Sequence, residues 1–315
     1  MESLLTQDIM SVKGRIALVT GGSSGIGRMI SQGLVTNGAK VYIVALPGDP
    51  IDQTVQDLNA YGIESGGSAE GYACDLSSKE SISKLAEIIS GKETKLDMLI
   101  SNAGIRRDPP IACNVLTATL AELQESMWSS RESDWADTFQ VNTTAHYFLS
   151  IAFLPLLAAA ADQPLDDGRR GQDDGRGVVV ITSSCASMHN ATNVDLTSYA
   201  TSKAATDHLV KLLAAKFHRF YVRVVGINPG FVPSNMNPVG AAGNMFSGLF
   251  DKVPAKRAGR AEDLAGAVLY LVSRAGVSRC FHSLFQMLMK MLQSYVDGVS
   301  LCIDGGRILL ANGQE

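Results

Sequence analysis

The stretch that decides the fold is Thr20-Gly21-Gly22-Ser23-Ser24-Gly25-Ile26-Gly27. Before it, residues 15–20 (RIALVT) are typical of a short buried strand; after it, residues 25–37 have helical spacing up to Gly38. Glycines between a strand and a helix permit a tight turn and let the backbone approach a pyrophosphate, whose charge is met by the helix amino terminus. Alone, the glycines would also fit a plain tight turn. Their position predicts a dinucleotide-binding strand–turn–helix unit.

The alternation that starts there continues along the chain. Short β-branched runs alternate with amphipathic stretches, which is the pattern of βαβ units and of a parallel sheet buried on both faces. The expected strands are 15–20, 40–45, 69–74, 97–101, 177–182 and 222–227, and the clearest helices are 25–37, 51–61, 77–90 and 261–273. We therefore predict an α/β fold over residues 1–315, a single doubly wound Rossmann-type domain with helices on both faces of a mainly parallel sheet.

Three segments do not fit a minimal domain of this type. Residues 106–131 form a long polar connection, which we expect to be a surface loop with some helix. Residues 162–176 (DQPLDDGRRGQDDGR) are rich in Gly, Asp and Arg and predict a solvated, mobile loop. Residues 277–293 are rich in Met and Phe and have no turn chemistry. The last segment is an atypical insert.

Composition excludes several classes of protein. Hydrophobic residues make up 46% of the chain, and 27 basic against 31 acidic residues give a net charge of −4, without the basic excess of a nucleic-acid binder. Residues 1–13 have no signal or transit pattern, and the apolar stretch 151–161 is interrupted by Pro155 and too short to span a bilayer. The five cysteines are scattered without metal-ligand spacing. We expect a cytoplasmic protein without metal, nucleic acid or membrane span.

A second motif carries the chemistry. Tyr199 and Lys203 are separated by one helical turn, so they lie on one face of a predicted helix. A neighbouring ammonium would stabilise the phenolate and lower the pKa of Tyr199 towards the range useful for general acid–base catalysis. Ser184 follows the strand 177–182 and can donate a hydrogen bond to a developing alkoxide. An isolated Tyr-x-x-x-Lys pair would more often be a surface pair, but here the other motifs occur in the right order.

With these motifs the chain resembles the short-chain dehydrogenase/reductase family from about Lys13 to Gly306. The matching motifs, in order, are Thr20-Gly21-x-x-x-Gly25-x-Gly27, Cys74-Asp75-Leu76, Asn102-Ala103-Gly104, Val141-Asn142, Ser183-Ser184, Tyr199-x-x-x-Lys203, Asn228-Pro229-Gly230 and Ile303-Asp304-Gly305-Gly306. The stretch 229–236 and the Ile-Asp-Gly-Gly ending resemble the 3-oxoacyl reductase-like branch, including the rhamnolipid-type β-ketoacyl reductases. The resemblance implies a homodimer or homotetramer built on the helices that contain Asn142 and Tyr199.

The resemblance also implies a role for each matching residue. Tyr199 would exchange the proton, Ser184 would polarise the carbonyl, and Lys203 would hold the nicotinamide ribose. Asn142 would hold, through its backbone carbonyl, a water bonded to Lys203. Residues implied in cofactor binding are Gly21, Ser23, Ser24, Gly25, Ile26, Gly27, Asp75, Leu76, Asn102, Ala103, Gly104, Tyr199, Lys203, Pro229, Gly230, Val232 and Ser234. The spacing from Ser184 to Tyr199 is slightly longer than is common in the family, so Ser183 stays an alternative.

The end of the strand 40–45 bears on the choice of cofactor. An acidic residue there would bind the ribose 2′-hydroxyl of NAD and repel a 2′-phosphate, but Ala45 occupies that position. Ser24 and Leu46 stand where the usual basic partners of the phosphate would be, and Arg28 is a candidate substitute. The sequence therefore favours NADP(H) over NAD(H).

The substrate is defined only by class. The loop 231–256 is apolar enough to cover a hydrophobic substrate, although the same residues would suit core packing. Met188, His189 and Asn190 are expected to face the pocket, with His189 as part of its wall. We predict reduction of a ketone, such as a 3-oxoacyl or other lipophilic carbonyl, to a secondary alcohol, or the reverse reaction. The alternative is a catalytically silent NADP(H)-binding regulator, which the presence of both Tyr199 and Lys203 disfavours.

The insert 277–293 has two interpretations. Deleting it joins Gly276 to Ser294 and restores the short connection expected in the family. It opens with Val-Ser, which a GTAAGT donor site would encode, and it closes with Gln, which a CAG acceptor would encode. We favour a retained intron. The alternative is a real extra helix with one apolar face, made by Cys280, Leu284, Met287, Leu288 and Met291.

Overall fold

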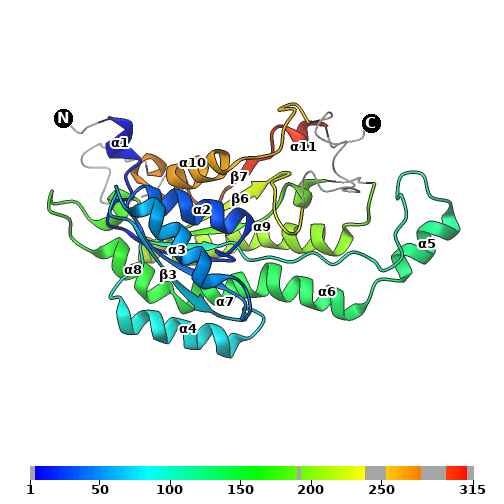
Figure 1. The fold of residues 1–315 in the computed structure, drawn as a ribbon, viewed down its shortest axis with the longest axis horizontal. Helices are drawn as coiled ribbons and strands as arrows, with labels where there is room; N and C mark the ends of the chain where they lie inside the picture. Colours follow the sequence, from blue (N-terminus) through cyan, green and yellow to red (C-terminus); the bar gives the residue numbers. More distant parts are fainter. Residues whose placement is uncertain (1–3, 190–192, 238–252, 278–295, 311–315) are drawn as a thin grey trace.

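The computed structural model describes residues 4–189, 193–237, 253–277 and 296–310. In this part of the chain seven parallel strands form one sheet in the order β3-β2-β1-β4-β5-β6-β7 (Figure 1). The strands are β1 (Ile16–Thr20), β2 (Lys40–Ala45), β3 (Ser68–Ala73), β4 (Met98–Ser101), β5 (Val178–Thr182), β6 (Arg223–Pro229) and β7 (Ser300–Ile303). The order reverses between β1 and β4, and in such sheets the crevice at that point binds ligands.

Helices cover both faces of the sheet. One face is packed by α2 (Gly25–Thr36), α3 (Ile51–Gly62) and α10 (Ala261–Val272), and the other by α4 (Lys79–Lys92), α7 (Ala145–Ala152), α8 (Leu154–Asp162) and α9 (Thr197–Phe217) (Figure 1). Leu34 and Val268 are buried on the first face, and Leu149 and Leu213 on the second. The predicted doubly wound Rossmann-type fold is confirmed.

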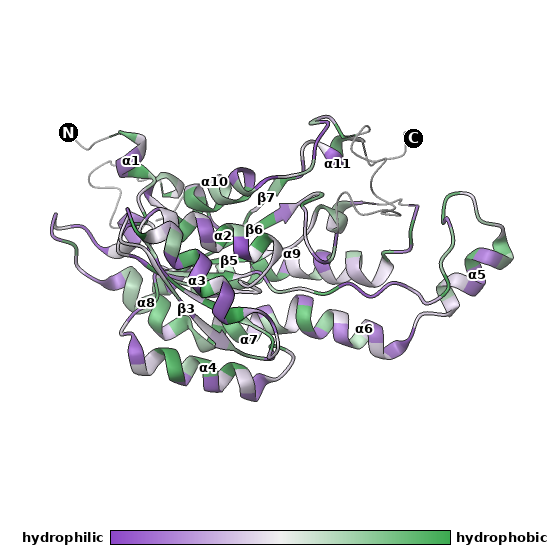
Figure 2. Ribbon diagram, viewed as in Figure 1, coloured by the Kyte–Doolittle hydropathy of each residue, from purple (hydrophilic) through white to green (hydrophobic). Residues whose placement is uncertain are grey.

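The central strands are apolar without alternation because helices cover them on both sides. All residues of β5 (VVVIT) and of β6 (RVVGINP) are buried. Along α4, hydrophobic and hydrophilic residues recur in bands, as Figure 2 shows, and Ile82, Leu85, Ala86 and Ile89 are its buried positions. The helix begins at a side-chain cap, since Ser78 accepts a hydrogen bond from the Ser81 amide. The strand and helix patterns are thus explained by packing.

The connection 106–131 contains α5 (Leu120–Trp128), as expected of a loop with some helix. It is followed by α6 (Glu132–Phe139), and both helices project away from the sheet (Figure 1). The remaining described segments are short: α1 (Thr6–Ile9), η1 (Gln140–Thr144), η2 (Gly171–Asp174), η3 (Cys185–Met188), η4 (His218–Phe220), η6 (Arg274–Gly276) and α11 (Arg307–Leu310).

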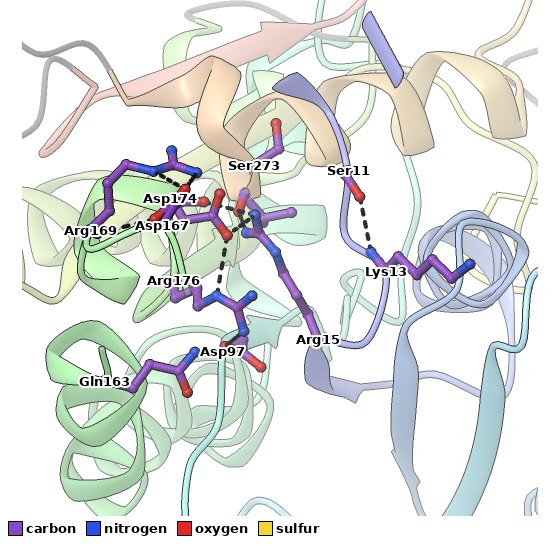
Figure 3. Close-up of polar contacts among 12 residues, drawn as sticks. Ser11, Lys13, Arg15, Asp97, Gln163, Asp167, Arg169, Asp174, Arg176 and Ser273 are labelled. Carbon is purple, nitrogen blue, oxygen red and sulfur yellow. Dashed lines mark hydrogen bonds and ion pairs between the residues drawn. The ribbon is translucent and has the colours of Figure 1, made fainter. Parts of the chain in front are cut away.

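The segment 162–176 is only in part the solvated loop that its composition predicts: most of residues 162–170 are exposed, whereas residues 171–176 are half-buried or buried. Asp174 at the end of η2 accepts an ion-paired hydrogen bond from Arg15, with an Nη2–Oδ2 distance of 3.0 Å, and a second from Arg176 at 3.2 Å. Arg176 also pairs with the buried Asp97 at 3.1 Å, as Figure 3 shows. Arg15 is only 2% exposed, and its Nη1 donates to the Val272 carbonyl at 2.7 Å. The loop therefore supplies partners for a buried guanidinium at the amino end of the sheet.

Two sequence expectations concern the insert 277–293 and the membrane span. Apart from Val277, the insert lies outside the described residues, so its two interpretations stay predictions. Within them, no single helix is long and apolar enough to cross a membrane, and one bent pair, Glu132–Ala152 with Leu154–Asp162, passes that test by length and composition.

The charge network around Arg15 generates a stability prediction. Asp174→Ala removes the ion-paired partner of a buried guanidinium, so we expect it to lower the free energy of unfolding by about 3 kcal/mol. The control is Asp167→Ala in the same loop, since Asp167 pairs with Arg169 at the surface and an exposed pair contributes about 1 kcal/mol or less. Urea denaturation of both variants measures the difference. Equal decreases in the free energy of unfolding for the two variants would contradict the role of Asp174 as the partner of the buried Arg15.

Candidate active site

A cavity of about 300 Å³ lies at the carboxyl ends of β1, β4, β5 and β6. Predicted site residues from distant parts of the chain line it together: Gly21, Ser24, Gly25, Ile26, Asn102, Ala103, Gly104, Ser184, Tyr199, Lys203, Pro229, Gly230, Val232 and Ser234. A second recess adjoins the glycine-rich turn and is lined by Ser23, Asp75 and Leu76 with Gly21, Ser24, Ala103 and Gly104. Of the predicted residues, Gly27 and Asn142 line neither space but pack directly behind them.

The glycine-rich turn has the close packing that a dinucleotide site needs. Gly21 and Gly25 have φ values of +64° and +50°, which L side chains rarely adopt. A Cβ at Gly27 would lie 2.1 Å from the Gly21 carbonyl oxygen, so no side chain fits there. The turn leads into the amino terminus of α2, whose first amides can face an anion. These residues fit a bound pyrophosphate.

The loop after β4 is held against β1. The amides of Asn102 and Ala103 donate to the Thr20 hydroxyl at 2.9 and 3.1 Å, and the Asn102 side chain donates to the Thr20 carbonyl at 3.0 Å. A Cβ at Gly104 would lie 3.2 Å from Asn142 Oδ1 and 3.3 Å from Lys203 Nζ. Glycine at 104 therefore keeps the floor of the cavity open beside Lys203.

Asn142 lies in η1, a π-helical turn between α6 and α7, and such turns are frequent at functional sites. Its buried side chain accepts from the Ile105 amide at 2.8 Å and donates to the Ile105 carbonyl at 2.9 Å. Its backbone carbonyl, expected to hold a water, accepts a hydrogen bond from the Thr206 hydroxyl at 2.6 Å. In the structure Asn142 thus fixes the loop that follows β4.

Lys203 is buried inside the site. It is 2% exposed, and its Nζ donates to the Thr182 carbonyl at 2.9 Å at the end of β5. Burial lowers the pKa of Lys203 to about 8, against the smaller raising effect of the Asp207 carboxylate. Its Nζ lies 5.8 Å from the centre of the Tyr199 ring. The ammonium therefore titrates near neutral pH.

Tyr199 and Ser184 lie next to each other in the cavity. Burial raises the pKa of Tyr199, and a hydrogen bond with the Ser184 side chain lowers it by a smaller amount. The expectation that Lys203 depresses the pKa of Tyr199 is wrong for this structure, because Lys203 Nζ is bonded to the Thr182 carbonyl instead. The phenol is therefore in its protonated form at neutral pH, ready to donate.

The structure separates the two candidate serines. The Ser183 hydroxyl donates to the Lys203 carbonyl at 2.9 Å, inside the packing of β5 against α9. The Ser184 hydroxyl accepts from the Ala186 amide at 3.1 Å, which orients it beside Tyr199. Ser183 is thus engaged with backbone, and Ser184 is the serine that faces the phenol.

The stretch after β6 closes the cavity from another side. A Cβ at Gly230 would lie 2.7 Å from Asp304 Cα, so the chain passes closely over the end of β7. Ser234 lies over the glycine-rich turn, where a Cβ at Gly25 would come within 2.9 Å of the Ser234 Cβ. Beyond Asn237, residues 238–252 of the expected substrate loop lie outside the described residues, as does Asn190.

The second recess contains a carboxylate that the sequence reading missed. Asp49, four residues after Ala45, accepts from the Ser23 hydroxyl at 3.3 Å and from the Leu46 amide at 3.2 Å. Arg28, the proposed phosphate partner, pairs with Asp57 at 2.5 Å and does not line the recess. The charged residues lining it are Asp49, Asp75, Asp137 and Arg107. The spacing from β2 gave no sign that Asp49 folds back to Ser23.

The main cavity is also lined by residues that the motifs did not indicate. Arg106, Leu196, Phe231, Met236 and Arg307 line it, together with His189, which was expected there. Arg307 directly follows the Ile-Asp-Gly-Gly motif, and this position was its only sequence signal. Burial is the main cause that lowers the pKa of His189, so its ring is neutral at pH 7.

Comparisons with known proteins agree with this geometry. The family model described as short chain dehydrogenase matches residues 15–242. The short-chain dehydrogenase/reductase PhomF of Diaporthe leptostromiformis is 34% identical over 284 residues, which cover 87% of this chain and 90% of that protein. The rhamnolipids biosynthesis 3-oxoacyl-(acyl-carrier-protein) reductase of Pseudomonas aeruginosa is 30% identical, with 94% and 97% covered.

A solved structure described as the Pseudomonas aeruginosa RhlG/NADP active-site complex matches with a TM-score of 0.74 at 29% identity, covering 95% of this chain and 98% of that chain. The predicted resemblance to the 3-oxoacyl reductase-like branch is therefore confirmed. With the family model covering most of the chain and the motifs gathered at one cavity, the chain belongs to the short-chain dehydrogenase/reductase family of oxidoreductases.

Proposed function

We propose that this chain reduces a ketone to a secondary alcohol with NADP(H), or catalyses the reverse reaction. The observation that carries the proposal is that Ser184, Tyr199 and Lys203 line one cavity together with the glycine-rich turn. A protonated phenol, a hydroxyl beside it and a buried ammonium are the groups that carbonyl reduction needs. The alternative of a silent regulator is not favoured, because none of the three groups has been lost.

The proposed chemistry divides between cofactor and chain. The nicotinamide, when bound, supplies the hydride that forms the new C–H bond at the carbonyl carbon. Tyr199 gives its phenolic proton to the carbonyl oxygen, so an O–H bond forms as the carbonyl π bond is lost. Ser184 donates a hydrogen bond to the same oxygen as negative charge develops there. Lys203 would hold the nicotinamide ribose through its ammonium group, which donates hydrogen bonds.

The remaining predicted residues hold this arrangement in place. We assign the pyrophosphate to the turn 21–27 and to the first amides of α2, because its glycines leave no room for a Cβ at Gly27 and let the backbone approach the anion closely. Asp75 and Leu76 would flank the adenine in the second recess. Asn142 acts as a positioning residue, since its side chain fixes the backbone of Ile105 next to Gly104.

NADP(H) is the cofactor we propose, with Asp49 as the residue that limits the selectivity. Ala45 leaves the end of β2 without the carboxylate that would bind a ribose 2′-hydroxyl, and the similar RhlG structure is described as an NADP complex. Asp49, however, already occupies the Ser23 hydroxyl and the Leu46 amide in the same recess, and its charge opposes a 2′-phosphate.

The substrate we propose is a lipophilic ketone, of which a 3-oxoacyl thioester is one example. Leu196, Phe231 and Met236 give the cavity an apolar wall beyond the catalytic residues. We further propose a cytoplasmic homodimer or homotetramer assembled through the helices that contain Asn142 and Tyr199. Exposed apolar side chains on α7 and α9, Tyr147, Ile151 and Leu212, support that surface.

The first test replaces the proton donor. Tyr199→Phe keeps the ring but removes the proton, so we expect NADPH binding to be retained and turnover to fall at least about a hundredfold. Nicotinamide absorbance with a panel of aliphatic, 3-oxoacyl and steroid ketones gives the wild-type rates, and fluorescence of bound NADPH gives the affinity. Near-normal turnover of the Phe variant would refute the mechanism, and a wild-type enzyme silent on the whole panel would favour the regulator.

The second test concerns the 2′-phosphate. Asp49→Ser removes the opposing charge and frees the Ser23 hydroxyl, so we expect the NADPH-to-NADH ratio of kcat/KM to rise about tenfold or more. Ala45→Asp should move the same ratio in the opposite direction. The matched control is Asp52→Ser, an exposed carboxylate that does not line the recess. If Asp49→Ser behaves like the control, Asp49 has no part in cofactor selectivity.

The third test uses the titration of Lys203. Because burial lowers its pKa to about 8, Lys203 is charged below that pH and neutral above it. Reduction should therefore be fastest below about pH 8, and its kcat/KM should fall as the pH rises through that value, while Tyr199 keeps its proton. A pH profile of wild type and of Lys203→Met measures this. A wild-type rate that stays flat to about pH 10 would contradict the assignment.

A further inference from the structure

The cavity that contains Tyr199 is lined by basic side chains from three parts of the chain. Arg106 follows β4, Lys203 belongs to α9, and Arg307 begins α11. Among the described residues that line this cavity, none is an aspartate or glutamate. A cavity lined by cations and by no carboxylate attracts an anionic ligand.

Two of these cations have recorded partners. Lys203 Nζ donates to the Thr182 carbonyl, and Arg106 Nη2 pairs with Asp108 at 2.8 Å. Arg307 differs from both. It is 6% exposed, its guanidinium lies 5.9 Å from the centre of the Phe231 ring, and its Nε has no hydrogen-bond partner among the described residues.

The carboxylate of Asp304, three residues before Arg307, is already used by the backbone. Asp304 Oδ1 accepts from the Gly306 amide at 3.0 Å, and Asp304 Oδ2 accepts from the Ile308 amide at 2.7 Å. No ion pair between Asp304 and Arg307 is formed within the described part of the chain. Asp304 therefore shapes the start of α11 and leaves Nε of the Arg307 guanidinium without a partner among the described residues.

A second unpartnered group lies on the same wall. His189 lines the cavity, its buried Nε2 has no partner among the described residues, and the positive charge of Arg307 acts on its ring. An unsatisfied buried donor costs about 1–3 kcal/mol, and more for a charged group. An oxyanion bound between Arg307 and His189 would accept hydrogen bonds from both the guanidinium and the imidazole and so remove this cost.

We propose that Arg307, with His189 beside it, binds a carboxylate of the substrate, so that the preferred substrates are lipophilic oxo acids and the corresponding hydroxy acids. The inference rests on the proposed function, in which the reacting carbonyl lies at Tyr199 and Ser184. Guanidinium forms two parallel hydrogen bonds to a carboxylate, which fixes the orientation as well as the affinity. The apolar side chains of Leu196, Phe231 and Met236 accommodate the carbon chain. Arg307 thereby becomes the residue that selects the substrate.

A binding measurement tests this without depending on turnover. We expect decanoate to bind the enzyme in the presence of NADPH, in isothermal titration calorimetry, at least about tenfold more tightly than decanol, which has the same chain without the charge. Arg307→Met should weaken decanoate binding about tenfold or more, Arg307→Lys should retain part of it, and neither should change decanol binding. The control is Arg219→Met, since Arg219 also lies over a phenylalanine ring, 4.7 Å from the centre of Phe220, but does not line the cavity.

Kinetics then separate this inference from the proposed function. With 5-oxodecanoate and its methyl ester, Arg307→Met should raise KM for the acid and leave the ester and NADPH unchanged. Equal decanoate affinity in wild type and Arg307→Met would overturn the inference, as would a loss confined to NADPH, which would assign Arg307 to the cofactor phosphates. Should Arg307→Met unfold, the affinities of Arg307→Lys for decanoate and decanol decide instead: a decanoate affinity equal to that of the wild type would overturn the inference. Failure to reduce any ketone would refute the proposed function while leaving the decanoate result interpretable.

Discussion

The burial of one ammonium group is the constraint on which the site depends. Lys203 is placed between α9 and the end of β5, where burial removes most of the solvation of its charge, and among the described residues the Thr182 carbonyl and the Asp207 carboxylate compensate. Asp207 is in turn held by the Asn228 amide at 3.0 and 3.1 Å, and the same amide donates to the Ser184 carbonyl. One network therefore joins the lysine, its counter-charge and the serine across β5, β6 and α9.

Local pattern was sufficient for the fold because the sheet is covered on both faces. Residues 40–45 were predicted as a strand and form β2, and the predicted helix 25–37 ends one residue later than α2. The strand predicted at 222–227 continues to Pro229, because Pro229 is paired with Ile303 of β7, and no local pattern reports such a pairing. The glycine turn and the Tyr-Lys pair were found because their spacing itself carries the chemistry.

The features that the sequence did not reveal all depend on partners far along the chain. Residues 162–176 have the composition of a solvated loop, but Asp174 meets Arg15, which is 159 residues away. Helical spacing placed Tyr199 and Lys203 on one face, yet the lysine reaches the carbonyl of Thr182 rather than the phenol. Asp49 and Arg307 lie in no motif, and only the folded chain brings them to the recess and the cavity.

The charge network around Arg15 lies at the amino edge of the sheet, whereas both cavities open at the carboxyl edge. The residues of the charge network and the residues that line the two cavities are different residues. Substitutions in the cavity lining can therefore alter the chemistry without removing the ion pairs that stabilise the opposite edge. This matters because most substitutions that change function lower the free energy of unfolding. For laboratory evolution this separation makes the lining the place to diversify, with Arg15, Asp97, Asp174 and Arg176 left fixed.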